Sequence, residues 1–460
     1  MSPDPVLIAD TLVARVGVRR RDRWSRTRLL AFQQAALDRL LRHARTTSPY
    51  YREALRGAPD LPLAELPVLT KARLMEQWDR ICTSDALRLT EVEGRLAETE
   101  RAATDPGHAW RGRWRLAATG GTTGRRGVFA WNRQEWIQVL NSYARVNDWA
   151  GVSVGLGRPL RTAFVSSLNP THQSAVVGAS LRSSLVPTLR LDAVTPETDL
   201  VDKLNRFEPR LLVGYASMVG LLAQAQLDGR LQIHPERVVA ASEPLTAPAR
   251  DAAQAAWGES VVIDSYAATE TASIASTCPQ GGWHLCEDFV IVEPVTEDYR
   301  PVPIGVTADK VLVTVLFSRT LPLIRYELTD SIRLSPETCP CGLPFALLEA
   351  VEGRTEDTLS LPGRDGPVRV HPNVFHAALE ALAPHGWQVE QRPNRLIVRL
   401  VGTAADPELA GRRVEQALAD HSIDTVPVEV LTVTAIERTR LGKTQLVKAL
   451  PGSPGLHGRA

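Results

Sequence analysis

Long apolar runs are absent from this chain: no stretch approaches the roughly 18 residues that suggest a membrane-spanning helix. Charge of one sign is also absent, because 53 lysines and arginines oppose 52 aspartates and glutamates and leave a net charge of +1. We therefore expect neither a nucleic-acid partner nor a membrane partner. The first residues carry acidic side chains before arginines, an order that does not suit a secretory signal.

Cysteine is scarce and odd in number, which argues against a disulfide framework. The chain has five cysteines, four of them between positions 278 and 341. Reduced thiols are typical of the cytoplasm, which is the expected location. Aromatic residues make up only 5% of the chain, so composition does not indicate the size of a bound ligand.

The length and the pattern of apolar residues indicate an α/β protein of more than one domain, since 460 residues are too many for one ordinary hydrophobic core. Apolar residues recur at helical spacing over 26–47, 133–150 and 198–207. Short apolar runs typical of buried strands occupy 162–167, 210–215, 237–242, 260–266, 309–317 and 323–328. This alternation predicts a large N-terminal body of mixed or parallel sheets covered by helices.

The composition changes after Gly353-Arg354, and we expect a linker near 354–358. Beyond it the pattern predicts helices near 373–383 and 407–420 and strands near 387–391, 395–401 and 427–433. These elements form a compact α+β unit, which we interpret as a small lid domain. The predicted domains are residues 1–354 and 355–460.

A run rich in glycine and threonine is the sharpest functional signal. It consists of Thr119, Gly120, Gly121, Thr122, Thr123 and Gly124. Such a run can lay backbone N–H groups and hydroxyls around a polyphosphate, although an ordinary loop has the same composition. It is not a Walker P-loop, because Arg125 stands where the second glycine belongs. The Gly442-Lys443-Thr444 triplet fails as well, because Glu437 occupies the required upstream position.

A second candidate site combines cysteine and histidine. Cys278 and His284 form a Cys-x5-His pair, and Cys339 and Cys341 form a Cys-x-Cys pair. Thiolate and imidazole ligands suit zinc, but these spacings are not those of a common zinc finger. The alternative is a set of reduced side chains that only pack. Cys286 is a substitute ligand, and the remote Cys82 is expected to be structural.

Eight short motifs, taken in order, resemble the adenylate-forming (acyl-activating) ligases, and most closely their phenylacetate–CoA ligase branch. The motifs are ATGGTTGRRGVF, ASEPLT, SYAATE, CPQGGWHLCED, PLIRYELTD, CPCG, EGRTED and RTRLGK. Each is weak alone, but all eight occur in the family's order, and the resemblance extends over nearly the whole chain. The resemblance implies an enzyme that activates a carboxylic acid with ATP and Mg²⁺, forms an acyl-adenylate, releases pyrophosphate and passes the acyl group to an acceptor.

The resemblance also implies roles for individual residues. Residues 119–124 hold the β- and γ-phosphates, Tyr266 flanks the adenine, and Thr269 touches the α-phosphate. Glu270 binds Mg²⁺, Lys443 bridges the acid and the α-phosphate, and Cys278, His284, Cys339 and Cys341 hold a structural zinc. The other implied ATP-binding residues are Ser242, Glu243, Pro244, Ala267, Ala268, Asp330 (ribose) and Arg354 (phosphate or ribose).

The sequence says less about the carboxylic acid substrate and the acyl acceptor. An aryl or amino-aryl acid is expected in a pocket formed by His172, Gly214, Tyr215, Ala216 and Ser217, although His172 is also read as an ordinary loop histidine. The lid is expected to rotate about Glu356 between the half-reactions.

CoA is the first acceptor that the resemblance implies. The stretch LPGRDGPVRVHPNVF replaces the family's usual glycine-containing turn after the hinge, which favours an amine or a carrier-protein thiol as the alternative. A non-catalytic nucleotide-binding protein is the second alternative. A homodimer is the assembly we expect.

Overall fold

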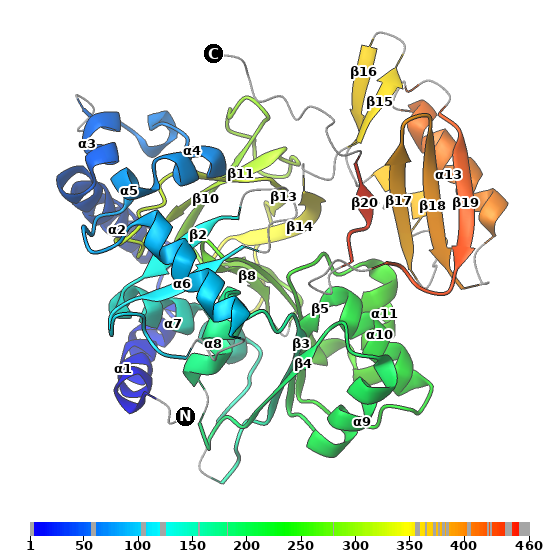
Figure 1. Ribbon diagram of the computed structural model, residues 1–460, viewed down its shortest axis with the longest axis horizontal. Coiled ribbons are helices and arrows are strands. Elements are labelled where there is room, and N and C mark those ends of the chain that lie inside the picture. Colours follow the sequence, from blue (N-terminus) through cyan, green and yellow to red (C-terminus); the bar gives the residue numbers. More distant parts are fainter. Residues whose placement is uncertain are drawn as a thin grey trace.

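The computed structural model divides into a body and a smaller unit beside it (Figure 1). The residues that the structure describes are 4–56, 61–102, 107–119, 126–154, 157–181, 183–278, 280–354, 359–363, 366–370, 374–375, 378–379, 382, 386–402, 406–420, 423, 426–437 and 444–449. The predicted linker, from 355 to 358, lies outside them. Within them, no helix is long and apolar enough to cross a membrane.

A large mixed sheet forms the centre of the body, in the order β13-β14-β9-β8-β7-β6-β5-β3-β4. Its parallel half consists of β3 (Thr162–Ser166), β4 (Thr188–Asp192), β5 (Leu211–Tyr215), β6 (Arg237–Ala241) and β7 (Val262–Ala268). The helices between these strands are α8 (Gln173–Leu181), α9 (Glu197–Phe207), α10 (Ala216–Leu227) and α11 (Ala247–Trp257). The predictions at 162–167, 210–215, 237–242 and 260–266 are confirmed, because buried parallel strands read as continuous apolar runs.

The other half of this sheet is antiparallel and consists of β8 (Ala272–Thr277), β9 (Trp283–Leu285), β13 (Asp330–Ser335) and β14 (Leu347–Arg354). A second sheet contains β10 (Val290–Val295), β11 (Lys310–Val315) and β12 (Tyr326–Leu328). A hairpin joins β1 (Arg115–Ala118) to β2 (Val128–Trp131). The prediction of strand over 323–325 is wrong, because Arg325 has a φ of 48° and turns the chain before β12.

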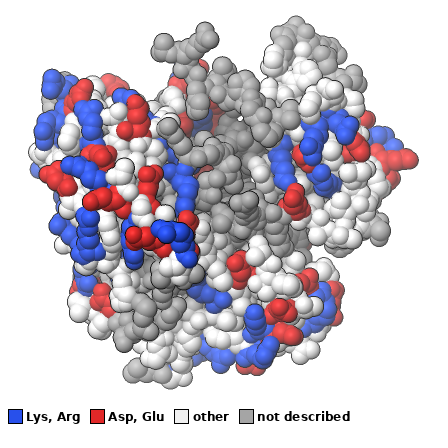
Figure 2. All heavy atoms as spheres, in the orientation of Figure 1, with Lys and Arg blue, Asp and Glu red and all other residues white. Residues whose placement is uncertain are grey.

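Helices of the first 150 residues cover one side of the body (Figure 1). They are α1 (Pro5–Arg21), α2 (Arg26–Thr47), α3 (Pro49–Ala54), α4 (Lys71–Glu76), α5 (Trp78–Ile81), α6 (Leu89–Arg101) and α7 (Arg133–Trp149). Helix α2 has the predicted bounds: the Ser25 side chain caps its start, and Pro49 follows its C-cap. On the face in Figure 2, basic and acidic side chains lie next to one another over these helices.

The C-terminal unit, as we call the part from β15 to β20, has its own apolar core around Trp387, Val398 and Val414. Its sheet has the order β19-β18-β17-β20 and is covered by α13 (Pro407–Asp420). The strands of the unit are β15 (Leu359–Gly363), β16 (Gly366–Val370), β17 (Trp387–Arg392), β18 (Arg395–Val401), β19 (Val428–Val433) and β20 (Val447–Lys448). β20 is the edge strand nearest the body in Figure 1. The four predicted elements after 386 are confirmed.

Candidate active site

The carboxyl ends of the parallel strands bring several predicted residues to one edge of the large sheet. Tyr215 ends β5, Ser242 follows β6, and Tyr266 and Ala267 lie near the end of β7. Parallel strands place their carboxyl ends at the same edge, where ligands bind in open α/β sheets. The predicted adenine and acid residues therefore lie on neighbouring strands of a single edge.

Asp330 links Tyr266 of β7 to Arg354 of β14. The Tyr266 hydroxyl donates a hydrogen bond of 2.8 Å to the Asp330 carboxylate. Asp330 opens β13 and stands directly opposite Arg354 on β14 in the antiparallel register. The side chain of Arg354 lies outside the described residues, but its backbone position is fixed by this pairing. Three residues that the sequence assigns to one nucleotide are thus neighbours in space.

Thr269 and Glu270 form the turn between β7 and β8, and buried polar side chains support it. The Glu270 carboxylate is 8% exposed and accepts a hydrogen bond of 3.3 Å from the Tyr326 hydroxyl. The carbonyl oxygen of Thr269 accepts one of 2.9 Å from the Gln173 amide, and Gln173 in turn accepts one of 2.8 Å from Tyr143. Burial, with a smaller contribution from Glu270, raises the pKa of Tyr143, so this hydroxyl stays protonated and donates.

The base of the glycine–threonine run is closed by two bonds. The Thr119 N–H donates to the Gly127 carbonyl oxygen at 2.9 Å, and the Gly127 N–H donates to the Thr119 hydroxyl at 2.8 Å. Arg126 then contacts the Glu100 carboxylate at 2.8 Å and the Thr171 hydroxyl at 2.7 Å. Gly120, Gly121, Thr122, Thr123 and Gly124 lie outside the described residues. The structure therefore fixes where the predicted phosphate loop leaves and rejoins the body.

Glu243 contacts two backbone N–H groups from distant segments. One carboxylate oxygen accepts from Ser217 at 2.9 Å, and the other accepts from Thr444 in the C-terminal unit at 2.7 Å. Lys443 and Glu356 lie outside the described residues. Pro244 follows Glu243 in the loop between β6 and α11.

The predicted acid-binding residues gather around the end of β5 and the start of α8. Tyr215 is 4% exposed, and its hydroxyl accepts a hydrogen bond of 3.0 Å from the Ser167 N–H. His172 is 9% exposed and lies just before α8. The Ser217 hydroxyl is buried and has no hydrogen-bond partner among the described residues. At Gly214 an added Cβ would be 3.4 Å from the Val165 carbonyl oxygen, so this glycine faces packed backbone.

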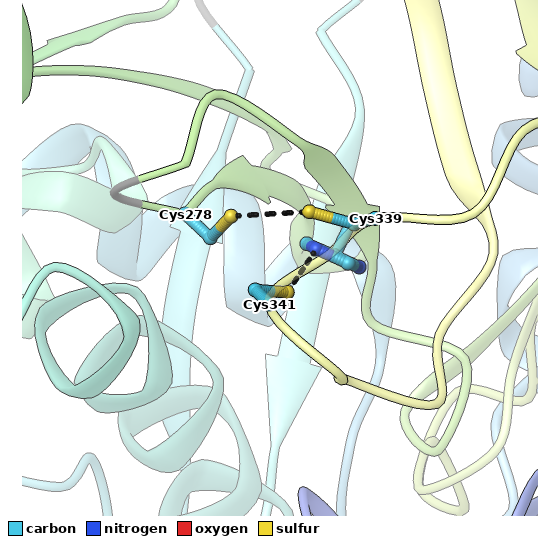
Figure 3. A group of neighbouring side chains, drawn as sticks. Cys278, Cys339 and Cys341 are labelled. Atoms are coloured by element: carbon cyan, nitrogen blue, oxygen red, sulfur yellow. Dashed lines mark hydrogen bonds between the residues drawn. The ribbon is translucent and has the colours of Figure 1, made fainter.

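Cys278, His284, Cys339 and Cys341 converge on one point between β8, β9 and the turn before β14 (Figure 3). Their ligand atoms all lie within 4.8 Å of one another. Cys278 Sγ is 3.7 Å from Cys339 Sγ, and Cys341 Sγ is 3.1 Å from His284 Nε2. Two thiols on one side and a thiol with an imidazole on the other form a four-donor set of the type that zinc prefers.

The surroundings of this cluster orient its histidine. His284 Nδ1 lies 3.3 Å from the Phe345 carbonyl oxygen, which leaves Nε2 for the cluster. Burial lowers the pKa of His284, which favours the neutral imidazole that binds metals. An added Cβ at Gly282 would lie 2.5 Å from Cys339 Sγ, so only glycine fits beside the cluster. The alternative ligand Cys286 hydrogen-bonds with Ser273 at 3.8 Å and does not belong to the group.

Known proteins resemble this chain along most of its length. A phenylacetate-coenzyme A ligase of Thermus thermophilus is 25% identical over 405 residues, which cover 84% of this chain and 81% of that protein. A phenylacetate-coenzyme A ligase of Aromatoleum evansii is 25% identical over 460 residues, covering 92% and 94%. No model of a protein family matches the chain.

A crystal structure of 2-hydroxyisobutyryl-CoA ligase with 2-HIB-AMP superposes with a TM-score of 0.70. It is 20% identical and covers 94% of this chain and 91% of the other, which shows the shared fold. These relatives support the adenylate-forming ligase superfamily, and within it the phenylacetate–CoA ligase-like branch, for this chain. The predicted α/β body with a small C-terminal domain is confirmed, as is the prediction of an enzyme of this class.

Several residues that the sequence did not single out support the site. Tyr326 lies inside the motif PLIRYELTD, and Gln173 directly follows His172, which we expected near the acid. Their neighbours in the motifs were the only available signal, because their partners Glu270 and Thr269 are distant in sequence. Glu100 carried no signal, since it is one of several acidic residues on an exposed helix.

Proposed function

We propose that the protein activates a carboxylic acid with ATP and Mg²⁺ and transfers the acyl group to CoA. The observation that carries this proposal is the contact of Tyr266 with Asp330, which stands opposite Arg354, together with the buried Glu270 in the turn that follows the strand of Tyr266. In the first step a carboxylate oxygen of the acid bonds to the α-phosphorus, and the bond to the leaving pyrophosphate breaks. In the second step the CoA thiol, losing its proton, attacks the acyl carbon, and AMP leaves.

Each predicted residue has a physical task in the first step, which depends on positioning and charge neutralisation more than on a protein nucleophile. Asp330 accepts hydrogen bonds from the ribose hydroxyls, Thr269 contacts the α-phosphate, and the run 119–124 encloses the outer phosphates. Lys443 supplies a mobile positive charge as charge develops on the acid and α-phosphate. Glu270 offers the carboxylate oxygens that Mg²⁺ prefers, and the ion neutralises the phosphates.

The acid is an aryl or amino-aryl carboxylic acid, held near Tyr215, Ala216, Ser217 and His172. The unpartnered Ser217 hydroxyl supports a polar ligand group at this position. The second candidate acceptor is an amine or a carrier-protein thiol. It is favoured by the hairpin β15–β16, which the chain forms where the family has a glycine-containing turn.

The test is pyrophosphate release with ATP-Mg²⁺ over a panel of aryl, amino-aryl and fatty acids, with and without CoA. We expect release with an aryl acid and a rise in turnover when CoA is added. If pyrophosphate release depends on the acid but does not rise with CoA, the acceptor would be an amine or a carrier-protein thiol instead. ATP binding without release for any acid would contradict the proposal and support a non-catalytic role.

The cysteine–histidine cluster is proposed to hold a structural zinc ion. We expect about one equivalent of zinc per chain in protein purified without chelator, and loss of that zinc in the Cys339→Ser/Cys341→Ser variant. Elemental analysis measures the metal, and thermal unfolding should show a lowered midpoint in the variant. The control is Cys82→Ser, a buried cysteine outside the cluster, which should keep its zinc. Wild-type protein without metal would exclude the site.

A further inference from the structure

Glu243 joins the body to the C-terminal unit through a single carboxylate. One oxygen accepts a hydrogen bond of 2.9 Å from the Ser217 N–H in the body, and the other accepts one of 2.7 Å from the Thr444 N–H. The two donors are 227 positions apart in the chain by their numbers (444 − 217). A hydrogen bond to an ionised acceptor is about twice as strong as one between neutral groups.

The body holds its side of this contact in a fixed place. Ser217 is the second residue of α10, whose N-cap residue Tyr215 makes no side-chain capping bond. The Glu243 carboxylate supplies that cap from outside the helix, where the helix dipole favours a negative charge. Ser242, the residue before it, has a φ of 67°, a strained conformation for serine.

In the C-terminal unit, the segment that carries Thr444 is held by strand β17. Three residues after Thr444, β20 begins and pairs in parallel with β17. The carbonyl oxygen of Gln445 accepts a hydrogen bond of 2.8 Å from the Gln388 side chain, and the Leu446 carbonyl oxygen accepts one of 2.7 Å from the Val389 N–H. Glu243 therefore contacts a segment that moves only with its sheet.

We propose that Glu243 is a positioning residue, which latches the C-terminal unit to the body at Thr444 and so favours the orientation of this unit that adenylation uses. This inference rests on the proposed function, because Lys443 directly precedes Thr444 in the chain. Both carboxylate oxygens of Glu243 accept backbone hydrogen bonds, and the expectation that this residue also binds ATP stays a prediction. The latch acts in adenylation, and any rotation of the C-terminal unit breaks its Thr444 bond.

The first measurement is hydrogen–deuterium exchange of nucleotide-free protein. In Glu243→Ala, we expect the amides of 444–449 to exchange roughly tenfold faster or more, the effect of losing one charge-assisted hydrogen bond. Peptides from β17 and β18 should exchange as in the wild type. The control is Glu259→Ala, which removes an exposed glutamate with the same change of charge. Unchanged exchange at 444–449 would overturn the latch whatever the protein catalyses.

The second measurement separates the half-reactions. Glu243→Ala should lower acid-dependent ATP–pyrophosphate exchange roughly tenfold and leave thioester formation from supplied acyl-adenylate unchanged or faster. Glu243→Gln, which keeps one oxygen acceptor, should recover part of the loss. Equal loss in both steps would overturn the positioning role in favour of a role in folding.

A backbone variant tests the same bond from its other side. Thr444→Pro removes the donating N–H and should reproduce the Glu243→Ala defect, whereas Thr444→Ala keeps the N–H and should behave as wild type. A defect of equal size in both variants would contradict the proposal. Wild-type protein that releases no pyrophosphate with any acid would refute the proposed function, and the exchange measurement would still decide the latch.

Discussion

Lys443→Ala is expected to lower the rate of acyl-adenylate formation by roughly 10²–10³-fold, the usual effect of removing one group that stabilises transition-state charge. Lysine is a compact positive charge on a flexible stem, which suits a group that approaches the α-phosphate only in one orientation of its domain. In the proposed mechanism the second half-reaction does not use that charge. Thioester formation from supplied acyl-adenylate should therefore keep nearly the wild-type rate.

Single-turnover measurement of each half-reaction checks this result. The control is Lys448→Ala, a lysine in β20 whose ammonium pairs with Glu437 at 3.2 Å. This variant should form acyl-adenylate nearly as fast as the wild type, because an exposed ion pair contributes little. If Lys443→Ala slows both half-reactions equally, the lysine does not act in adenylation alone and its assignment is wrong.

Asp288→Asn should destabilise the folded body strongly, at a cost of about 3–5 kcal/mol in the free energy of unfolding. The side chains of Arg145 and Asp288 are both completely buried. Two hydrogen bonds join them, one of which measures 2.8 Å. Trp149, Phe289 and Phe345 surround the guanidinium, with ring centroids 4.9–5.4 Å from it. Removal of the Asp288 charge leaves the guanidinium among these rings with Asp22, at 3.4 Å, as a more distant counter-charge.

Denaturant unfolding measures this cost, with Glu76→Gln as the control for an exposed pair. Burial alone would raise the pKa of Asp288, but Arg145 and Arg21 hold it below its usual range. Its stabilisation is therefore present above the unfolded carboxyl pKa of about 3.9 and is lost as the pH falls through the lower folded value. A loss for Asp288→Asn no larger than for Glu76→Gln would contradict the argument.

Sequence reasoning succeeded where one structural rule dominates a segment. The runs at 162–167 and 237–242 are strands because both faces of a parallel strand are buried, which removes polar residues from them. Helix α2 was predictable because Ser25 and Pro49 mark its ends. Helix α1 was not predicted, because Leu12, Val13 and Val16 are exposed opposite its buried residues and blur the helical period.

Within the site, the sequence predicted residue types better than partners. The glycine–threonine run, SYAATE and the cysteine–histidine pairs were recognisable from order and chemistry. That Tyr266 donates to Asp330, or that Glu243 contacts Thr444, follows only from how distant segments pack. Sequence spacing did not decide whether the cysteines and His284 form one cluster. They come together because β9, which carries His284, pairs with the start of β14.

Strand β14 connects the cysteine cluster to Asp330. Its first residue, Leu347, stands opposite His284 of the cysteine cluster, and its last, Arg354, stands opposite Asp330. Eight residues of strand span roughly 23–27 Å. A packed sheet has low compressibility and transmits strain. Distortion at the cluster would therefore displace the Arg354 end of the same strand. If this end contacts the nucleotide as proposed, oxidation of the thiols would weaken nucleotide affinity far from the sulfur atoms.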